Sequence, residues 1–523
     1  MNYPEIDKPV IGEMAVRPNL DHQYPLGGDF DWAVMEEELG VRQKNEMNLA
    51  HLAIDRHAMS ARRDKVALFW EGKNGETERY TFGELSRETN KFANVLAGLG
   101  VKKGDRVFTY MERLPELYIS VFGGLKLGAI VGPLFADFGP DPVRDRLKDS
   151  GARVLVTSPA LKARIESILP ELTDLEHIIV VDRTGAHAAS GGEIDYRKAM
   201  SAASPNFAGI RTGATDYSIM HYTSGTTGKP KGAVHVHYAA VQQYATGKWV
   251  LDFHDDDIYW CTADPGWVTG TSYGMSAPWT NGVSQVVFEG GFRASAWYSI
   301  IQKYKVTVWY TAPTAIRMLM KVGEHAAAQH DLSTLRHICS VGEPLNPEAI
   351  VWGLDAFGQG IHDNWWQTET GAILIANYAF MPVRPGSMGR PIPGIKAAII
   401  DDNYVESPND VEGNLAIRPG WPSMFQTYWK NRELYESRFR NGWYITGDRA
   451  RRDADGYFWF VGRADDVINS AGHLVGPFEV ESALIEHPAV AEAGVIGKPD
   501  PIAMEIVKAF VSLKDGYQPT PEL

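Results

Sequence analysis

Residues 222–232 read Tyr-Thr-Ser-Gly-Thr-Thr-Gly-Lys-Pro-Lys-Gly and directly follow an apolar, strand-like run at 217–221. The eleven residues include four aliphatic hydroxyls, three glycines and two lysines. Glycine lets the backbone come close to a ligand, while N–H groups, hydroxyls and ammonium groups together compensate the charge of a polyphosphate. An ordinary polar turn explains the glycines and hydroxyls but not both lysines. We therefore expect a polyphosphate-binding loop after a strand of an α/β sheet.

The loop differs from the P-loop of nucleotide triphosphatases. That motif requires Ser or Thr immediately after its Gly-Lys pair. Here Pro230 follows Lys229. The sequence therefore disfavours a P-loop kinase or GTPase.

Composition limits the classes of protein to be considered. A chain of 523 residues is long enough for several hydrophobic cores. A net charge of −14 argues against a general nucleic-acid or anionic-membrane partner. Only Cys261 and Cys339 are cysteines, which suits a reducing cytoplasm, and no apolar run approaches the ~20 residues of a membrane span. We expect a soluble, cytoplasmic protein that acts on small molecules.

Strand-like and helix-like segments alternate along the chain. Asn74-Gly75 predicts a hairpin, and residues 81–84 have the spacing of a helix capping box. Beyond them the pattern predicts strand 106–111, helix 115–127, strand 129–132, helix 141–150, strand 153–157, helix 160–169 and strand 177–181. This rhythm is typical of a parallel sheet flanked by helices. Residues 32–61 are predicted to form one helix.

The second half of the chain predicts another sheet and then a change of texture. Its predicted strands are 258–261, 285–288, 307–311, 337–341 and 360–365. Beyond Gly386, short strands punctuated by Gly and Pro are expected at 397–401, 413–417, 443–446 and 457–461. These predict an α/β protein with a small β-rich unit.

Three further places carry groups suited to a nucleotide site. Glu369 could hold Mg²⁺, which prefers oxygen ligands, although a solvated loop glutamate is the simpler reading in isolation. Asp448 could accept hydrogen bonds from a ribose diol. Arg463 and the acids after it could equally form a charged turn. His235 and His237 alternate with valines, but two histidines without further ligands are more often structural than metal-binding.

Taken in order, these motifs resemble the acyl-adenylate-forming superfamily, which includes acyl-CoA synthetases, luciferases and peptide-synthetase adenylation domains, and most closely AMP-forming acetyl-CoA synthetases. The motifs are Tyr222 to Gly232, Tyr310-Thr311-Ala312-Pro313-Thr314, Val341-Gly342-Glu343-Pro344, Trp366 to Glu369, Thr446-Gly447-Asp448 and Gly462-Arg463-Ala464-Asp465-Asp466. The resemblance implies a large N-terminal domain, residues 1–465, of two α/β subdomains and a small β-barrel. A hinge at Asp465 and a small α+β lid, residues 466–523, would follow.

The resemblance also implies a reaction and its participants. A carboxylate and ATP form an acyl-AMP and pyrophosphate, and coenzyme A then takes the acyl group, with Mg²⁺ as the metal. The loop residues implied to hold the β- and γ-phosphates are Thr223, Ser224, Gly225, Thr226, Thr227, Gly228, Lys229 and Lys231. The resemblance further implies that Thr368 contacts the α-phosphate and that Glu369 contacts Mg²⁺. It places the adenosine against Gly342, Glu343, Pro344, Asp363, Asn364 and Trp365, and the ribose against Asp448 and Arg463. The implied coenzyme A contacts are Ala471, Gly472 and His473.

The acyl pocket implied by the resemblance consists of Val268, Thr269, Val341 and Trp366. A tryptophan would fill the volume that a longer alkyl tail needs, so acetate is the expected acid. Propionyl or short-to-medium-chain acyl-CoA synthetase remains the alternative, because one methylene contributes only ~1–3 kcal/mol to discrimination.

The sequence departs from the family pattern in two places. Leu474 stands where many similar enzymes carry a phosphate-contacting arginine, and no Gly-Lys turn occurs before Leu523. Such a lysine stabilises the α-phosphate in the family. We therefore expect an incomplete lid in a fragment of a longer enzyme that adenylates acetate poorly as given. The alternative is a catalytically impaired nucleotide-binding relative. The sequence gives no indication of oligomeric state.

Overall fold

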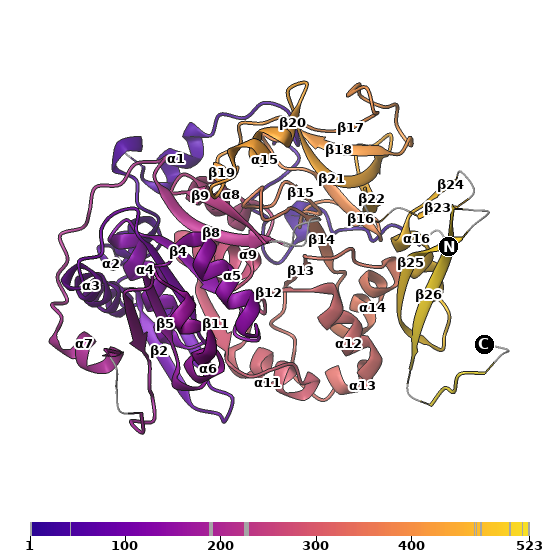
Figure 1. Ribbon diagram of the computed structural model, residues 1–523. Coiled ribbons are helices and arrows are strands. Elements are labelled where there is room, and N and C mark those ends of the chain that lie inside the picture. The colour runs from indigo at the N-terminus through magenta and orange to yellow at the C-terminus, as the bar shows by residue number, and fades with distance from the viewer. Residues whose placement is uncertain are drawn as a thin grey trace.

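The structure of the protein is a computed structural model that describes residues 3–41, 43–187, 192–223, 230–464, 466, 468–470, 473–500, 504–514 and 516–520. Its strands form three sheets, with helices packed around the first two (Figure 1). The predicted α/β class is confirmed, with mixed sheets in a large N-terminal part and a small C-terminal part. Among the described helices, none is long and apolar enough to cross a membrane.

The first sheet has the order β19-β9-β8-β4-β3-β5-β6-β7. Its strands are β3 (Arg106–Tyr110), β4 (Ile130–Leu134), β5 (Val154–Thr157), β6 (His177–Val180), β7 (Ile194–Asp195), β8 (Tyr217–Thr223), β9 (Lys231–Val236) and β19 (Thr427–Tyr428). Strands β3 to β8 pair in parallel, whereas β9 and β19 are antiparallel. Every residue of β4 and β5 is buried, because helices cover both faces of a parallel sheet.

Most helices of this first layer lie where the sequence predicts, but the helix predicted over 160–169 is divided into an α-helix that ends at Arg164 and a 3-10 helix (Glu166–Glu171). The capping box at Thr81 and Glu84 starts α3 (Phe82–Gly98), as predicted. Proline occupies the first position of α4 (Pro115–Lys126), α5 (Pro140–Ser150) and α6 (Pro159–Arg164), where its missing N–H costs no hydrogen bond. The remaining helices here are α7 (Tyr196–Ala202) and α8 (Ala239–Trp249).

The second sheet continues directly into the β-rich unit. Its order is β17-β18-β21-β22-β16-β15-β14-β13-β12-β10-β11-β1-β2, with β20 paired to β21. The strands are β1 (Val66–Glu71), β2 (Thr77–Thr81), β10 (Ile258–Cys261), β11 (Ser284–Phe288), β12 (Val308–Thr311), β13 (His337–Ser340), β14 (His362–Trp365), β15 (Ile375–Ala376), β16 (Ser387–Pro391), β17 (Ala397–Ile400), β18 (Gly413–Ile417), β20 (Phe439–Arg440), β21 (Trp443–Arg452) and β22 (Phe458–Arg463). The antiparallel strands expected as a small barrel are thus an extension of the second sheet through β15.

Short helices surround the second sheet. They are α9 (Val268–Thr271), a π-helix (Ser272–Ser276), α10 (Ala277–Thr280), α11 (Ala294–Tyr304), α12 (Pro313–Val322), α13 (Glu324–Ala327), α14 (Pro347–Phe357) and α15 (Arg432–Ser437). One apolar cluster contains residues of both large sheets, including Ile219 of β8 and Tyr310 of β12. The two sheets therefore share a core and are rigidly apposed.

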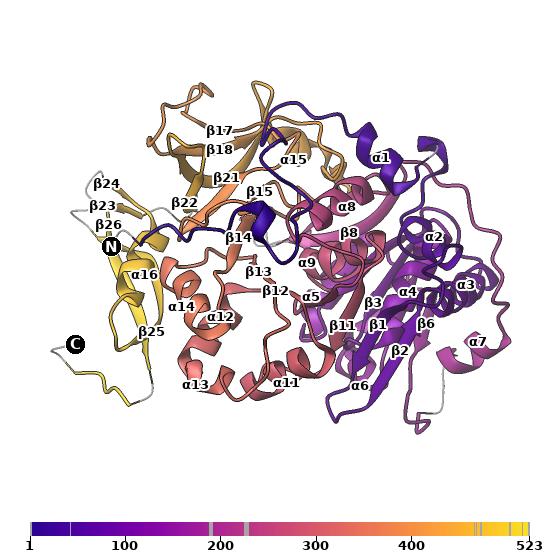
Figure 2. The same cartoon turned by 180° about the vertical axis from the view of Figure 1, so that it is seen from behind.

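The third sheet is built only from residues after 466. Strands β23 (Ile468–Ser470), β24 (His473–Val475), β25 (Val490–Asp500) and β26 (Met504–Leu513) have the order β24-β23-β26-β25, beside α16 (Pro477–Ile485). This unit lies next to α12 and α14 (Figure 2). The Asn346 amide, just before α14, donates to the Ser482 hydroxyl of α16 over 3.0 Å.

The single helix predicted over residues 32–61 is wrong. The structure has α1 (Ala33–Leu39), a 3-10 turn (Lys44–Glu46), a π-helix (His51–Asp55) and α2 (Arg56–Ala58). Gly40 takes a left-handed φ of 80°, which ends α1. The Asn48 side chain then accepts from the Ala50 amide over 2.9 Å and starts the next turn. A glycine and a capping asparagine thus override the apolar periodicity.

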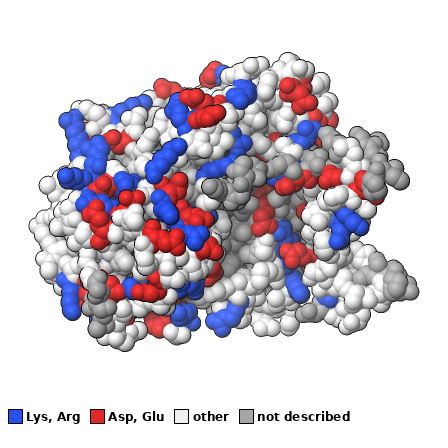
Figure 3. All heavy atoms as spheres, viewed as in Figure 1, with Lys and Arg blue, Asp and Glu red and all other residues white. Residues whose placement is uncertain are grey.

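Charged side chains are mixed over the surface. On the face shown in Figure 3, Lys and Arg lie among Asp and Glu rather than in one basic area. Local groups must therefore supply the positive charge for any anionic ligand.

Gly389 provides a test of the junction between β15 and β16. Its φ is +91°, and a Cβ there would collide with the Ala376 carbonyl oxygen. Gly75 has nearly the same φ, +93°, but no atom within 4 Å of its Cβ position. We expect Gly389→Ala to lower the free energy of unfolding by at least about 2 kcal/mol more than Gly75→Ala.

Urea denaturation of both variants measures that difference. The matched φ cancels the cost of placing alanine in the left-handed region, so the difference isolates the collision. Equal destabilisation by the two substitutions would contradict the close β15–β16 contact.

Candidate active site

A cavity of about 1200 Å³ lies at the carboxyl ends of β8, β12, β13 and β14. Residues at the end of β22 and in the third sheet also line it. Carboxyl ends of parallel strands are the usual ligand edge of an open α/β sheet. The predicted site residues that line it are Thr223, Lys231, Val268, Thr269, Val341, Gly342, Glu343, Pro344, Asp363, Asn364, Trp365, Trp366, Thr368, Glu369, Asp448 and Arg463. The fold thus gathers groups from positions 223 to 463 around one space.

The two ends of the hydroxyl-rich loop meet at this cavity. Thr223 ends β8 and Lys231 begins β9, and the two residues are paired in antiparallel register. Ser224, Gly225, Thr226, Thr227, Gly228 and Lys229 lie outside the described residues. Asp465, Ala471 and Gly472 do so as well, while the backbone of His473 begins β24 and pairs with Ser470.

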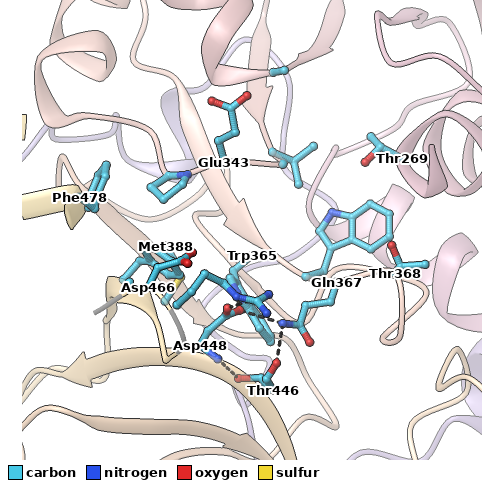
Figure 4. A pocket seen from close by; sticks show the side chains of 18 of the residues that line it. Thr269, Glu343, Trp365, Gln367, Thr368, Met388, Thr446, Asp448, Asp466 and Phe478 are labelled. Atoms are coloured by element: carbon cyan, nitrogen blue, oxygen red, sulfur yellow. Dashed lines mark hydrogen bonds and ion pairs between the residues drawn. The ribbon is translucent and has the colours of Figure 1, made fainter. Parts of the chain in front are cut away.

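Asp448 is the most connected carboxylate of the cavity. Its Oδ2 accepts from the Trp365 indole and from the Gln367 amide, each over 2.9 Å, and its backbone N–H donates to the Thr446 hydroxyl over 3.0 Å (Figure 4). Arg463 Nη1 lies 3.5 Å from Oδ1, since Asp448 and Arg463 are direct partners on β21 and β22. The carboxylate is therefore fixed in orientation at the cavity wall.

Burial raises the pKa of Asp448 to about 6. Arg463 and the hydrogen bonds from Trp365 and Gln367 act in the opposite direction and are outweighed. Asp448 thus ionises near neutral pH, where it can accept hydrogen bonds from a diol.

Asp363 is a second buried carboxyl group, on β14. Burial raises its pKa well above the usual range, and Oδ1 has no hydrogen-bond partner among the described residues. The side-chain amide nitrogen of neighbouring Asn364 also has no hydrogen-bond partner among the described residues. A buried wall with unsatisfied donors and acceptors is suited to a polar heterocycle.

Glu369 lies in a tight turn that only glycine permits. Gly371 has a φ of +72°, and a Cβ there would collide with the Ser423 carbonyl and lie 2.8 Å from the His235 ring. His235 Nε2 lies 2.8 Å from the Thr368 carbonyl oxygen, and Nδ1 lies 3.1 Å from the Ser423 carbonyl oxygen. The turn presents Thr368 and Glu369 to the cavity.

Contacts with the backbone indicate that His235 and His237 have structural roles. His237 Nδ1 accepts from the Leu49 amide over 3.1 Å, so both rings contact the backbone. No cluster of three or more potential metal ligands occurs among the described residues.

Glu369 fits a magnesium site in which substrate supplies most ligands. The Tyr428 hydroxyl donates to Oε1 over 2.7 Å, and no hydrogen bond from the described residues reaches Oε2. Mg²⁺ commonly takes one or two carboxylates plus phosphates and water. One oriented carboxylate that lines the same cavity as Thr223 and Lys231 meets that requirement.

Trp366 lines the cavity together with Val268, Thr269 and Val341. Its indole N–H donates to the Tyr310 hydroxyl over 3.1 Å, and that hydroxyl donates to Asn364 over 2.8 Å. The Tyr273 ring packs edge-on against both aromatic rings, with centroids 5.1 Å from Trp366 and 5.5 Å from Tyr310. The indole is therefore fixed in place.

Several lining residues were not predicted as site residues. They include Tyr310, Gln367, Met388, Arg438, Thr446, Phe460, Phe478 and Glu481. Tyr310, Gln367 and Thr446 lie inside motifs that the sequence analysis quotes, so motif membership could have identified them. Arg438 lies in no such motif, and only the fold brings it to the cavity.

Comparison with protein families and known proteins gives matches along nearly the whole chain. The "AMP-binding enzyme" family model matches residues 54–429, and the "AMP-binding enzyme C-terminal domain" model matches residues 479–523. An acetyl-coenzyme A synthetase of Bacillus subtilis is 53% identical over 508 residues, which are 97% of this chain and 88% of that protein. One from Pyrobaculum aerophilum is 42% identical and covers 91% of this chain and 76% of its own.

Two solved structures are similar in fold. A crystal structure of Brucella canis acyl-CoA synthetase has a TM-score of 0.80 and 37% identity, covering 94% of this chain and 89% of its own. An anthranilate CoA ligase in complex with anthranoyl-AMP has a TM-score of 0.84 and 33% identity, and the match covers 91% of this chain and 89% of the ligase chain.

The raised pKa of Asp448 makes stability depend on pH. The folded pKa of about 6 exceeds the ordinary value of 3.8, so the folded state binds more protons between these values. Raising the pH from 4 to 6 therefore removes about 2 kcal/mol of stability through this one group. We expect Asp448→Asn to abolish that part of the dependence.

Urea midpoints of the wild type and the variant at pH 4.5 and 6.5 measure the effect. The exposed Asp402 provides the control substitution Asp402→Asn. An unchanged pH dependence in Asp448→Asn would show that Asp448 does not ionise in this range.

Proposed function

Because the chain belongs to the AMP-binding enzyme family, we propose that it is an AMP-forming acetate:CoA ligase. Acetate and ATP form acetyl-AMP and pyrophosphate, and acetyl-AMP and coenzyme A form acetyl-CoA and AMP. The observation that carries the proposal is one cavity that is lined by the buried indole of Trp366, by Glu369 and by the fixed carboxylate of Asp448.

The first step needs positioning more than a protein nucleophile. An acetate oxygen attacks the α-phosphorus, a new P–O bond forms, and the bond to the leaving pyrophosphate breaks. Negative charge is concentrated on the phosphates, so fixed donors and cations near them stabilise the transition state. We assign Thr223 to Lys231 to the β- and γ-phosphates and Thr368 to the α-phosphate.

The adenosine is assigned to the opposite wall. Gly342, Glu343 and Pro344 would cover one face of the adenine, and Asp363, Asn364 and Trp365 the other. Asp448 and Arg463 would bind the ribose hydroxyls. The ionised form of Asp448 accepts those hydrogen bonds, which fits its pKa of about 6.

Glu369 would hold Mg²⁺, which when bound neutralises phosphate charge. The Tyr428 hydroxyl orients the carboxylate for that purpose. Glu369 is 9% exposed, so bulk water competes little with the ligand.

In the second step the coenzyme A sulfur attacks the acetyl carbonyl. The C–S bond forms, the C–O bond to AMP breaks, and the thiol proton is lost to solvent. We propose Ala471, Gly472 and His473 as the coenzyme A contacts, and a division into residues 1–465 and 466–523 that rotate about Asp465 between steps. The two free cysteines fit a cytoplasmic location, which is part of the proposal.

The proposal predicts a preference for the shortest acid. The chain is incubated with ATP, Mg²⁺, coenzyme A and acids from acetate to hexanoate, and AMP, pyrophosphate and acyl-CoA are measured. We expect acid-dependent release with kcat/KM for acetate about 10-fold or more above propionate, and smaller values for longer acids.

Other outcomes of this assay identify the alternatives. A higher kcat/KM for propionate or a longer acid would replace acetate as the substrate. AMP binding without acid-dependent pyrophosphate release, both by the chain as given and by a version with any native extension, would indicate a nucleotide-binding relative without ligase activity.

Trp366 is expected to set the acid length. Trp366→Gly removes the indole that Tyr310 holds in place, so kcat/KM for butyrate and hexanoate should rise at least about 10-fold while acetate falls. Trp352→Gly is the matched control, because Trp352 is equally buried (both 8% exposed) but belongs to a separate core cluster.

The control should lose stability without changing the ratio of rates between acids. If Trp366→Gly leaves that ratio unchanged, the indole does not close the acyl pocket.

A further inference from the structure

Arg438 lines the active-site cavity but has no role in the function described so far. It follows α15 and caps its end, and its carbonyl accepts from the Ile445 amide of β21 over 2.8 Å. Its side chain is half-buried, and its Nε is fully buried with no hydrogen-bond partner among the described residues. A buried guanidinium N–H without an acceptor is uncommon, because it forfeits hydration without replacement.

Arg438 lies close to a second guanidinium. A Cβ at Gly447 would be 3.8 Å from Nη1 of Arg438 and 3.7 Å from Nη2 of Arg463. Gly447 has a φ of +81° and carries no side chain, so the space between the two cations stays open. Two cations this close repel each other in a partly buried site, and an anion between them would relieve that repulsion.

The carboxylates nearby do not neutralise Arg438 directly. Glu369 is hydrogen-bonded to the Tyr428 hydroxyl, which lies between Glu369 and Arg438 and is influenced by both charges. No ion pair joins Arg438 to a carboxylate in the described parts of the chain, whereas Arg463 pairs with Asp448. The charge of Arg438 is therefore available to a ligand.

We propose that Arg438 binds a phosphate oxygen of the adenylate, as a phosphate-binding residue supplied by the large domain. This inference rests on the proposed function, because the adenylate is its substrate and intermediate. Arginine suits the role since its planar guanidinium donates two hydrogen bonds to one phosphate.

The position of Arg438 gives this contact a specific consequence. Position 474, in the segment after residue 465, is a leucine and supplies no charge. Arg438 precedes that segment and is anchored to β21, so its contact with phosphate does not depend on how the third sheet is oriented. The adenylate can remain bound while the lid changes position.

A purely structural role is the competing explanation. Arg438 could act only through its polar interactions with Tyr428 and Tyr444, which would keep Glu369 in place. That role would affect every ligand of the cavity equally. A phosphate contact affects only ligands that carry a phosphate, so comparing AMP with adenosine separates the two explanations.

The experiment measures binding of AMP and of adenosine to the full chain by calorimetry, without acid or coenzyme A. The variants are Arg438→Gln, Arg438→Lys and the control Arg440→Gln. Arg440 is exposed on β20, two positions away, and donates only to backbone carbonyls.

We expect Arg438→Gln to weaken AMP binding at least about 10-fold and adenosine binding less than about 2-fold. Arg438→Lys should recover part of the AMP affinity because it keeps the charge. Arg440→Gln should match the wild type for both ligands. Thermal unfolding midpoints confirm that the variants are folded.

Unchanged AMP affinity in Arg438→Gln overturns the inference, as does an equal loss for AMP and adenosine or a wild-type chain that does not bind AMP. Failure of the proposed function has a different signature. In that case AMP binding depends on Arg438, yet no acid supports pyrophosphate release.

Discussion

The site depends on the interactions of the buried Asp448 carboxylate. This carboxylate joins Trp365 and Gln367, at the end of the parallel part of the second sheet, to Arg463 in the antiparallel extension. A buried carboxylate is costly unless donors surround it, so these partners must keep their positions relative to one another. The walls of the cavity are thereby held together by the same group that is suited to bind ribose.

A second constraint acts on the turn that carries Thr368 and Glu369. The turn that presents Thr368 and Glu369 is possible only because Gly371 lacks a Cβ. His235 and Tyr428 then fix the carbonyl of Thr368 and the carboxylate of Glu369. Phosphate chemistry requires this rigidity, since a preorganised charge need not reorient when the transition state forms.

Electrostatics divides the cavity between its two ends. Trp366 and Tyr310 are buried and uncharged, whereas Lys231 and Arg438 supply cations where phosphates are proposed to lie. An overall charge of −14 makes such local cations necessary.

The sequence by itself determined the alternating elements, the α/β class and many of the residues that line the cavity. Local signals were sufficient there: the capping box at Thr81, proline at the start of α4, and the polar motifs after β8 and β14. The prediction of one helix over residues 32–61 was wrong, because Gly40 and Asn48 interrupt a helix that the apolar periodicity favours. Only the tertiary structure decided the continuity of the second sheet with the β-rich unit, the ties between Asp448 and Gln367, and the approach of Arg438 to Arg463. These depend on contacts between residues far apart in the chain, and the spacing of residues along a sequence does not specify which distant strands and turns come to lie together.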